Sequence, residues 1–265
     1  MSSVTSKVLL AKSTESLTLK INRPNERNPL DLSTISELIS AISACERDKD
    51  IRSVVITGSG KKSFASGVDL KEMSKVVTTA ESAIAYDEKV NALYKTIAAS
   101  PIPVIAKIQS NAIGGGAMLA MACDVAVASD KASFGLPAGR LGLMLSPQEH
   151  VMLLQRVSPS KAKYLILTGD RIDARTARQW GMIDFIVDEK DLDSRVDAIT
   201  ASMAKCARTS LSSSKQLLLA VATSSMSSLT EGLIKRCYHE VYESRNFREG
   251  VAAFVEKRQP SFWDK

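Results

Sequence analysis

The stretch that decides the fold is Asn111–Ser129, which reads NAIGGGAMLAMACDVAVAS. Three glycines, Gly114–Gly116, follow a predicted strand and open an apolar helix that reaches Cys123. The residues that favour strands come next, over Val125–Ala128. A strand, a glycine turn, a buried helix and another strand in immediate succession are typical of an α/β core.

The glycine-rich segments do not match the known nucleotide-binding motifs. GGGAM lacks the GxGxxG spacing of a dinucleotide-binding loop. Gly58–Ser63 fails as a phosphate-binding P-loop, because Lys62 stands where that motif needs Ser or Thr. The helix that starts at Gly114–Gly116 still has free amide hydrogens, which suit an oxyanion or a polarised carbonyl. Taken alone, the glycines are better explained as a tight turn.

Strands and helices alternate on both sides of this stretch. Ser146, Pro147 and Glu149 form the pattern of a capping box and therefore predict a helix start. After Asp191 the pattern is helical, with a break near residues 224–228. We expect an α/β core over residues 1–200 and a helical region over residues 201–265. The predicted strands are Leu17–Ile21, Ser53–Thr57 and Val104–Ile108, and the predicted helices are Leu32–Ile42, Glu81–Ala99 and Pro147–Arg156.

Composition excludes several classes of protein. The chain has 265 residues and a net charge of +6, which favours an anionic ligand without specifying nucleic acid. Aromatic residues make up 5% and no dense Lys/Arg tract occurs, which argues against RNA binding. Four cysteines without a CxxC pair and two distant histidines predict neither disulfides nor a metal site. No apolar run is long enough to span a bilayer and no signal-peptide pattern occurs, so we expect a cytoplasmic protein without membrane contact.

Five segments of the chain carry recognisable motifs. In order, they are INRPNERNPLDLSTISEL, VVITGSGKKSFASGVDLKEM, NAIGGGAMLAMACDVAVAS, LTGDRIDARTARQWGMIDFIV and EGVAAFVEKRQPSFWDK. They resemble the successive motifs of the crotonase superfamily, also called the enoyl-CoA hydratase/isomerase family. The resemblance implies a spiral core of ββα units, a C-terminal helical region that forms a trimer or a dimer of trimers, and acyl-CoA thioester substrates. It implies no cofactor beyond the CoA that the substrate carries, and polyanionic CoA would account for the positive charge.

The resemblance assigns an oxyanion hole to two backbone N–H groups. By position they belong to Val68 in FASGVDL and to Gly115 in GGGAM. Two such donors can hold the negative charge of an enolate, each typically contributing about 3 kcal/mol in the transition state. The family usually has Ala where Val68 stands, so the branched side chain is expected to narrow the acyl pocket and to leave the N–H group in place.

The resemblance also assigns contacts with CoA. Lys71 matches a family lysine near the cofactor, and Arg27 lies in the loop that approaches the adenosine phosphates. Phe254 and Lys257 match residues of the last helix that meet the adenine, in the family often from a neighbouring subunit. Without the motifs, each of these cations would be interpreted as a solvated surface residue.

Two positions depart from the family pattern. Hydratases of the family carry one catalytic glutamate after the GGG run and another in an FGxPE motif. Met118 and Ala138 occupy those places here. Because hydration needs a base for water and an acid for the α-carbon, the standard hydratase mechanism cannot be transferred to this chain.

Other residues are candidates for the lost proton-transfer roles. Ser146 holds the place of an acidic residue in other branches of the family, although a helix cap explains it as well. Glu149 either closes the capping box or projects near the thioester. His150 has a pKa suited to acid/base work, or is a histidine with structural partners only. Asp69 belongs to the general motif and is interpreted as structural, and the helix after the first oxyanion segment offers Tyr86, Asp87 and Glu88.

The sequence therefore supports two functions from different classes. The first is an enzyme that acts on an acyl thioester through an enolate, as a lyase, isomerase, decarboxylase or hydrolase with a non-standard acid/base set. The second is a non-catalytic acyl-CoA binding protein of the same fold. An intact oxyanion hole without the two glutamates is compatible with both. The carrier of the acyl group, CoA or an acyl carrier protein, stays open.

Overall fold

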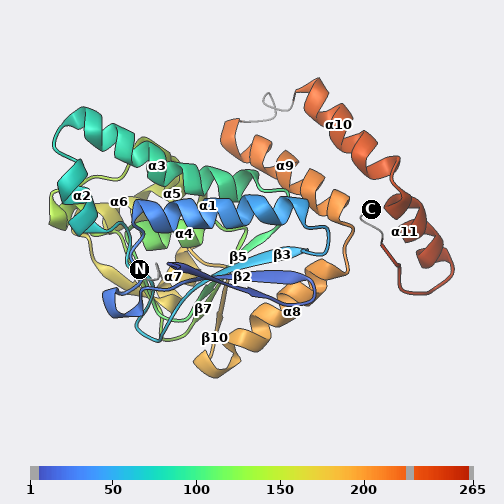
Figure 1. Cartoon of the computed structure of the whole chain (residues 1–265), viewed down its shortest axis with the longest axis horizontal. Helices are drawn as coiled ribbons and strands as arrows, with labels where there is room; N and C mark the ends of the chain where they lie inside the picture. The colour runs from blue at the N-terminus through green and yellow to red at the C-terminus, as the bar shows by residue number, and fades with distance from the viewer. Residues whose placement is uncertain (1–5, 225–229, 263–265) are drawn as a thin grey trace, which may run out of the picture.

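The computed structural model describes residues 6–224 and 230–262 and contains two β-sheets (Figure 1). In the larger sheet only the β1/β2 pair is antiparallel, and in the smaller sheet only the β8/β9 pair. The order of the larger sheet is β1 (Val8–Lys12), β2 (Ser16–Ile21), β3 (Ser53–Gly58), β5 (Val104–Ile108), β7 (Val125–Ser129) and β10 (Phe185–Val187). The order of the smaller sheet is β4 (Ser63–Ala65), β6 (Asn111–Ile113), β8 (Ser133–Gly135) and β9 (Arg171–Asp173).

Successive strands alternate between the two sheets. Each of β3, β5 and β7 lies in the larger sheet and is followed by β4, β6 and β8 of the smaller one, and a helical segment comes after each pair. This repetition confirms the predicted spiral of ββα units. The helices of these turns are α2 (Leu70–Val76), α3 (Ala80–Ala99), α4 (Gly115–Ala122) and α5 (Pro147–Arg156).

The central strands β3, β5 and β7 of the larger sheet are buried almost throughout, and their successive side chains point to opposite faces of the sheet. Val54 and Ile56 of β3 point into the main core, which also contains apolar residues of α1 (Leu32–Arg47), α3 and α4. Val55 points to the opposite face, where α8 (Leu192–Ala204) supplies the second cluster. The continuous apolar pattern of these strands therefore follows from their place between two layers of helices.

The predicted larger elements are confirmed. The strands and helices expected from Leu17 to Arg156 all occur, with ends that differ by a few residues. The strands of the smaller sheet were not predicted. Each has only three residues, which is too short for a period of two to be visible in the sequence.

The C-terminal part is helical, as predicted, and in Figure 1 its last two helices extend away from the sheets. The division at residue 200 stays a prediction, and α8 runs through it. The predicted break lies mostly in residues 225–229, outside the described residues. No helix of the described chain is long and apolar enough to cross a membrane. The remaining helices are α6 (Pro159–Thr168), α7 (Ala174–Trp180), α9 (Arg208–Ser224), α10 (Glu231–Tyr242) and α11 (Arg245–Val255).

Candidate active site

The two segments predicted to form the oxyanion hole lie against each other. Leu30 N donates to Gly67 O at 2.8 Å and Asp69 N donates to Leu30 O at 3.3 Å, so this isolated parallel bridge passes over Val68 without using its amide. A methyl group added at Gly115 would lie 3.5 Å from Val68 N. In residues 6–224 and 230–262, neither the Val68 nor the Gly115 amide donates a hydrogen bond to a protein acceptor. Two adjacent segments thus each present an unused N–H group.

Glycine is required where these segments meet. Gly67 has φ +92°, and a Cβ there would lie 2.9 Å from both Gly115 N and Ile113 O. A Cβ at Gly116 would lie 2.1 Å from Ala65 O, which is an impossible contact. The glycines therefore let α4 begin directly beside the segment that carries Val68.

A buried carboxylate lies close to this junction. Glu149 is only 7% exposed, and its Oε2 atom accepts hydrogen bonds from Ser146 N at 2.8 Å and Ser146 Oγ at 3.0 Å. Ser146 Oγ in turn accepts from Glu149 N at 3.3 Å, which confirms the predicted capping box of α5. Burial raises the pKa of Glu149 above its ordinary value of 4.5, and the charge of Asp87 adds to the rise. The capping residue is thus also a candidate acid or base.

Tyr94 joins Glu149 to the glycine turn. Its hydroxyl donates to Gly115 O at 3.2 Å, and burial together with the nearby Glu149 charge raises the pKa of Tyr94 well above its ordinary value. Asn91, one helical turn before Tyr94, contacts Ser146 Oγ through Oδ1 at 3.2 Å. Asp87, Asn91 and Tyr94 are spaced as one face of α3. A buried polar cluster of Asn91, Tyr94, Ser146 and Glu149 thus connects α3, α4 and α5, and the half-buried Asp87 lies on the same face of α3.

The other acid/base candidates differ in placement. His150 is half-buried, and its Nδ1 atom lies 3.0 Å from Ser146 O, so Nδ1 is the donor of this hydrogen bond. Tyr86 is buried and its hydroxyl has no hydrogen-bond partner in the described chain. Glu88 is exposed on the outer side of α3. Asp69 caps α2 and pairs with Arg23, in agreement with the structural interpretation of this residue.

Neither family glutamate position holds a group that can transfer protons. Met118 is fully buried in the main core on α4. Ala138 packs against the same core at the start of a short 3-10 helix, Ala138–Leu141.

The predicted CoA contacts are divided between distant parts of the chain. Arg27 is exposed in a left-handed conformation after β2, and Lys71 is exposed at the start of α2. Lys257 is exposed just after α11, which Figure 1 shows at the opposite end of the molecule from α2. Phe254 belongs to α11, but its side chain lies outside the described residues. The fold of one chain therefore brings Arg27 and Lys71, but not Lys257, near the oxyanion segments.

Sequence reasoning missed Arg23, Asn91 and Tyr94 as parts of the site. Asp87, Asn91 and Tyr94 are spaced as one helical face, but other polar residues along the same helix hide this spacing in the sequence. Arg23 was visible only as part of a turn.

The spiral of ββα units, with a glycine turn beside an unused amide, defines a protein of the crotonase superfamily. The family model described as enoyl-CoA hydratase/isomerase matches residues 13–265, and the chain belongs to this family. A relative in Mycobacterium bovis, named a probable enoyl-CoA hydratase, is 36% identical over 92% of this chain and 93% of its own. The mitochondrial enoyl-CoA hydratase of Pongo abelii is 33% identical over 93% of this chain and 83% of its own.

Solved structures agree with the sequence relatives. A crystal structure from Magnetospirillum magneticum, described as an enoyl-CoA hydratase/carnithine racemase, superposes with a TM-score of 0.92. It is 28% identical and covers 98% of this chain and 97% of its own. The predicted fold class is therefore confirmed.

Proposed function

We propose that the protein acts on an acyl-CoA thioester through an enolate. The thioester carbonyl would accept hydrogen bonds from the amides of Val68 and Gly115, which would hold the negative charge that develops on its oxygen. The observation that carries this proposal is the contact between two segments that each present an unused N–H group. The relatives' names, which refer to enoyl-CoA, support CoA as the carrier.

We further propose that Glu149 is the acid/base group. Its carboxylate lies beside Tyr94, which is hydrogen-bonded to Gly115 O. A thioester held at Gly115 N would then have its α-carbon within reach of Glu149. In its ionised form Glu149 would take the α-proton, and after protonation it would return that proton to the product. Ser146 would hold Glu149 in place and His150 would supply a second titratable group. The reaction class would be that of a lyase or isomerase.

Binding of CoA thioesters is the first expected result. Titration calorimetry should show binding of free CoA and tighter binding of acetoacetyl-CoA, because only the thioester offers a carbonyl to the two amides. Arg27→Ala and Lys71→Ala should weaken the binding of both ligands, since these cations are predicted to face the phosphates of CoA. If none of several acyl-CoA ligands binds, the proposal is wrong and a carrier-protein thioester becomes the substrate to test.

The pH dependence of kcat/KM should report Glu149. A general base must be ionised, so activity should fall as the pH drops through the pKa of Glu149, which burial places above 4.5. Glu149→Gln should lower kcat by about 10² to 10⁴-fold, while the amide still accepts the Ser146 N–H bond. Asp87→Asn should move the acidic limb to lower pH, because it removes a charge that raises the pKa of Glu149. Turnover by Glu149→Gln at the wild-type rate would contradict this role of Glu149. Absence of turnover by the wild type with every acyl-CoA that it binds would support the second candidate function, a non-catalytic acyl-CoA binding protein.

We propose that the protein forms trimers through α10 and α11, the helices that extend away from the sheets. Tyr238, Tyr242 and Phe247 form an aromatic series on α10 and α11, and each is more than 40% exposed. Contact with a second copy would cover these rings and would allow Lys257 to approach a neighbour's CoA site. Sedimentation at micromolar concentration should give a trimer or a dimer of trimers, and a monomer would contradict the proposal. The sequence also predicts apolar stripes for this contact from Leu217, Leu218, Leu219, Leu229, Leu233 and Ile234, of which Leu229 lies outside the described residues.

A further inference from the structure

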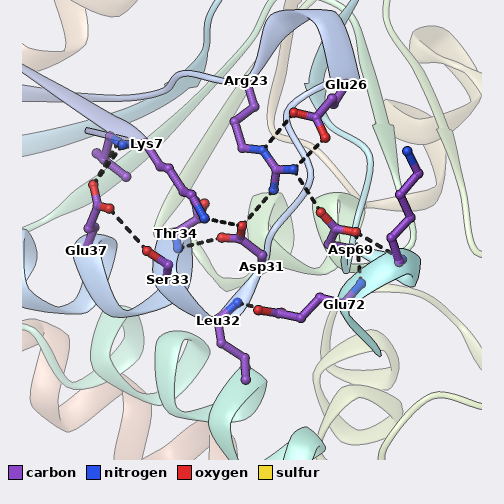
Figure 2. Close-up of polar contacts among 12 residues, drawn as sticks. Lys7, Arg23, Glu26, Asp31, Leu32, Ser33, Thr34, Glu37, Asp69 and Glu72 are labelled. Carbon is purple, nitrogen blue, oxygen red and sulfur yellow. Dashed lines mark hydrogen bonds and ion pairs between the residues drawn. The ribbon is translucent and has the colours of Figure 1, made fainter. Parts of the chain in front are cut away.

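Arg23 contacts three carboxylates in the turn that follows β2 (Figure 2). Its guanidinium lies 2.6 Å from Glu26 Oε2, 2.8 Å from Asp31 Oδ2 and 2.9 Å from Asp69 Oδ2. Glu26 belongs to the same turn and is 53% exposed, whereas Asp31 and Asp69 come from other segments and are 7% and 12% exposed. The last two pairs therefore link separate segments and are largely shielded from solvent.

Both linked carboxylates are N-caps. Asp31 Oδ1 accepts from Thr34 N at 2.8 Å at the start of α1. Asp69 Oδ1 accepts from Lys71 N at 3.0 Å at the start of α2. Arg23 thus holds the first turns of α1 and α2 together. The N-cap of α2, Asp69, directly follows Val68. A planar guanidinium presents several donors in a fixed geometry to both carboxylates, whereas a lysine ammonium is a single point charge on a flexible chain.

The backbone joins the same segments. The bridge from Leu30 to Gly67 and Asp69 runs beside the Arg23 ion pairs, and Leu32 N donates to Glu72 Oε2 at 2.9 Å. On the other side, Asn28 is fully buried, and its side chain accepts from Arg23 N at 3.0 Å. Arg27 lies between these fixed points. The loop that carries Arg27 and the segment that carries the Val68 amide are therefore one connected unit.

We propose that Arg23 is a positioning residue that couples CoA anchoring at Arg27 to carbonyl binding at the Val68 amide, through its contacts with Asp31 and Asp69. This inference rests on the proposed function. A coupled unit would bind the thioester carbonyl best when Arg27 has engaged a phosphate, because both contacts require the same position of the loop.

A ligand cycle tests the coupling. Kd is measured for free CoA and for acetoacetyl-CoA. The Kd of free CoA divided by the Kd of acetoacetyl-CoA gives the contribution of the acyl group to binding. In the wild type, Arg27→Ala should lower this ratio by about fivefold or more. In the Arg23→Met background, the ratio should already be low, and Arg27→Ala should leave it unchanged. Equal ratios in wild type and Arg27→Ala would overturn the proposal.

Matched variants separate positioning from general damage. Asp69→Asn keeps an N-cap on α2 but loses the ion pair, so it should behave like Arg23→Met. Glu26→Gln removes the exposed ion pair between Arg23 and Glu26 within one turn. It should change neither the Kd of free CoA nor that of acetoacetyl-CoA by more than about threefold. Arg23→Lys should restore part of the ratio. The infrared carbonyl frequency of bound thioester should rise in Arg23→Met and Asp69→Asn, since weaker hydrogen bonds polarise the carbonyl less.

Hydrogen exchange separates failure of this inference from failure of the proposed function. In Arg23→Met, amides of residues 24–30 and 66–71 should lose protection together. If the wild type bound no CoA ligand but both segments lost protection in Arg23→Met, the proposed function would be wrong, while the linkage of the two segments through Arg23 would be supported. Loss confined to residues 24–30 would overturn the coupling, whatever the ligand data show.

Discussion

Crotonyl-CoA should be hydrated at least about 10⁴-fold more slowly by this protein than by a family member that carries both glutamates. Each proton-transfer group typically contributes about 10² to 10⁴-fold, and Met118 and Ala138 provide neither. The amides of Val68 and Gly115 would remain, so binding of the thioester should persist while turnover is lost. The measurement is the decrease of enoyl thioester absorbance with time, with an ordinary hydratase as the reference.

Restoring the family residues should recover little. Met118 is fully buried, so Met118→Glu places a carboxylate in the core, where burial raises its pKa and lowers stability. The double variant Met118→Glu with Ala138→Glu is expected to gain more than either single variant, because acid and base act as one unit. Wild-type hydration at about 10 s⁻¹, a median enzyme rate, would show that other residues have taken both roles, with Glu149 and His150 as the first to test.

Lys215→Met should lower the free energy of unfolding by about 2–3 kcal/mol. Lys215 lies on α9 and is only 11% exposed, and its ammonium donates to Asp124 Oδ2 at 2.7 Å, Ile97 O at 2.9 Å and Ile102 O at 3.2 Å. Removing it leaves the Asp124 carboxylate without its cation. The expected loss is below that of a fully buried pair because Asp124 keeps 27% exposure. Urea denaturation measures this change.

The pH and a matched variant make the result specific. Burial raises the pKa of Asp124 and Lys215 opposes that rise, so the pKa should rise further in Lys215→Met. A carboxyl group whose folded pKa exceeds its unfolded value of about 3.9 favours folding when protonated, so the deficit should shrink as the pH falls. Lys107→Met removes a cation from Asp193, which is 79% exposed, and should cost less than about 1 kcal/mol. Equal losses of unfolding free energy in the two variants would contradict the stabilising role of the Lys215 contacts between α9 and Asp124.

Local sequence determined the larger elements and part of the site. The capping box of Ser146 and Glu149 was visible because its hydrogen bonds join residues three apart, and the long strands were visible because burial on both faces makes them apolar throughout. The glycine turn with free amides followed from the same local argument. Resemblance to a family added Val68 as the predicted second oxyanion donor, and in the structure the segment of Val68 lies against Gly115.

Only the tertiary structure decided the contacts between distant segments. Tyr94 meets Gly115 and Glu149 because α3, α4 and α5 pack together, and Arg23 meets Asp69 because the first turn lies beside the start of α2. The three-residue strands of the smaller sheet form for the same reason, since their hydrogen bonds come from partners far along the chain. Such contacts join residues that are far apart in the sequence and meet only when the chain has folded, so no local spacing of residues encodes them.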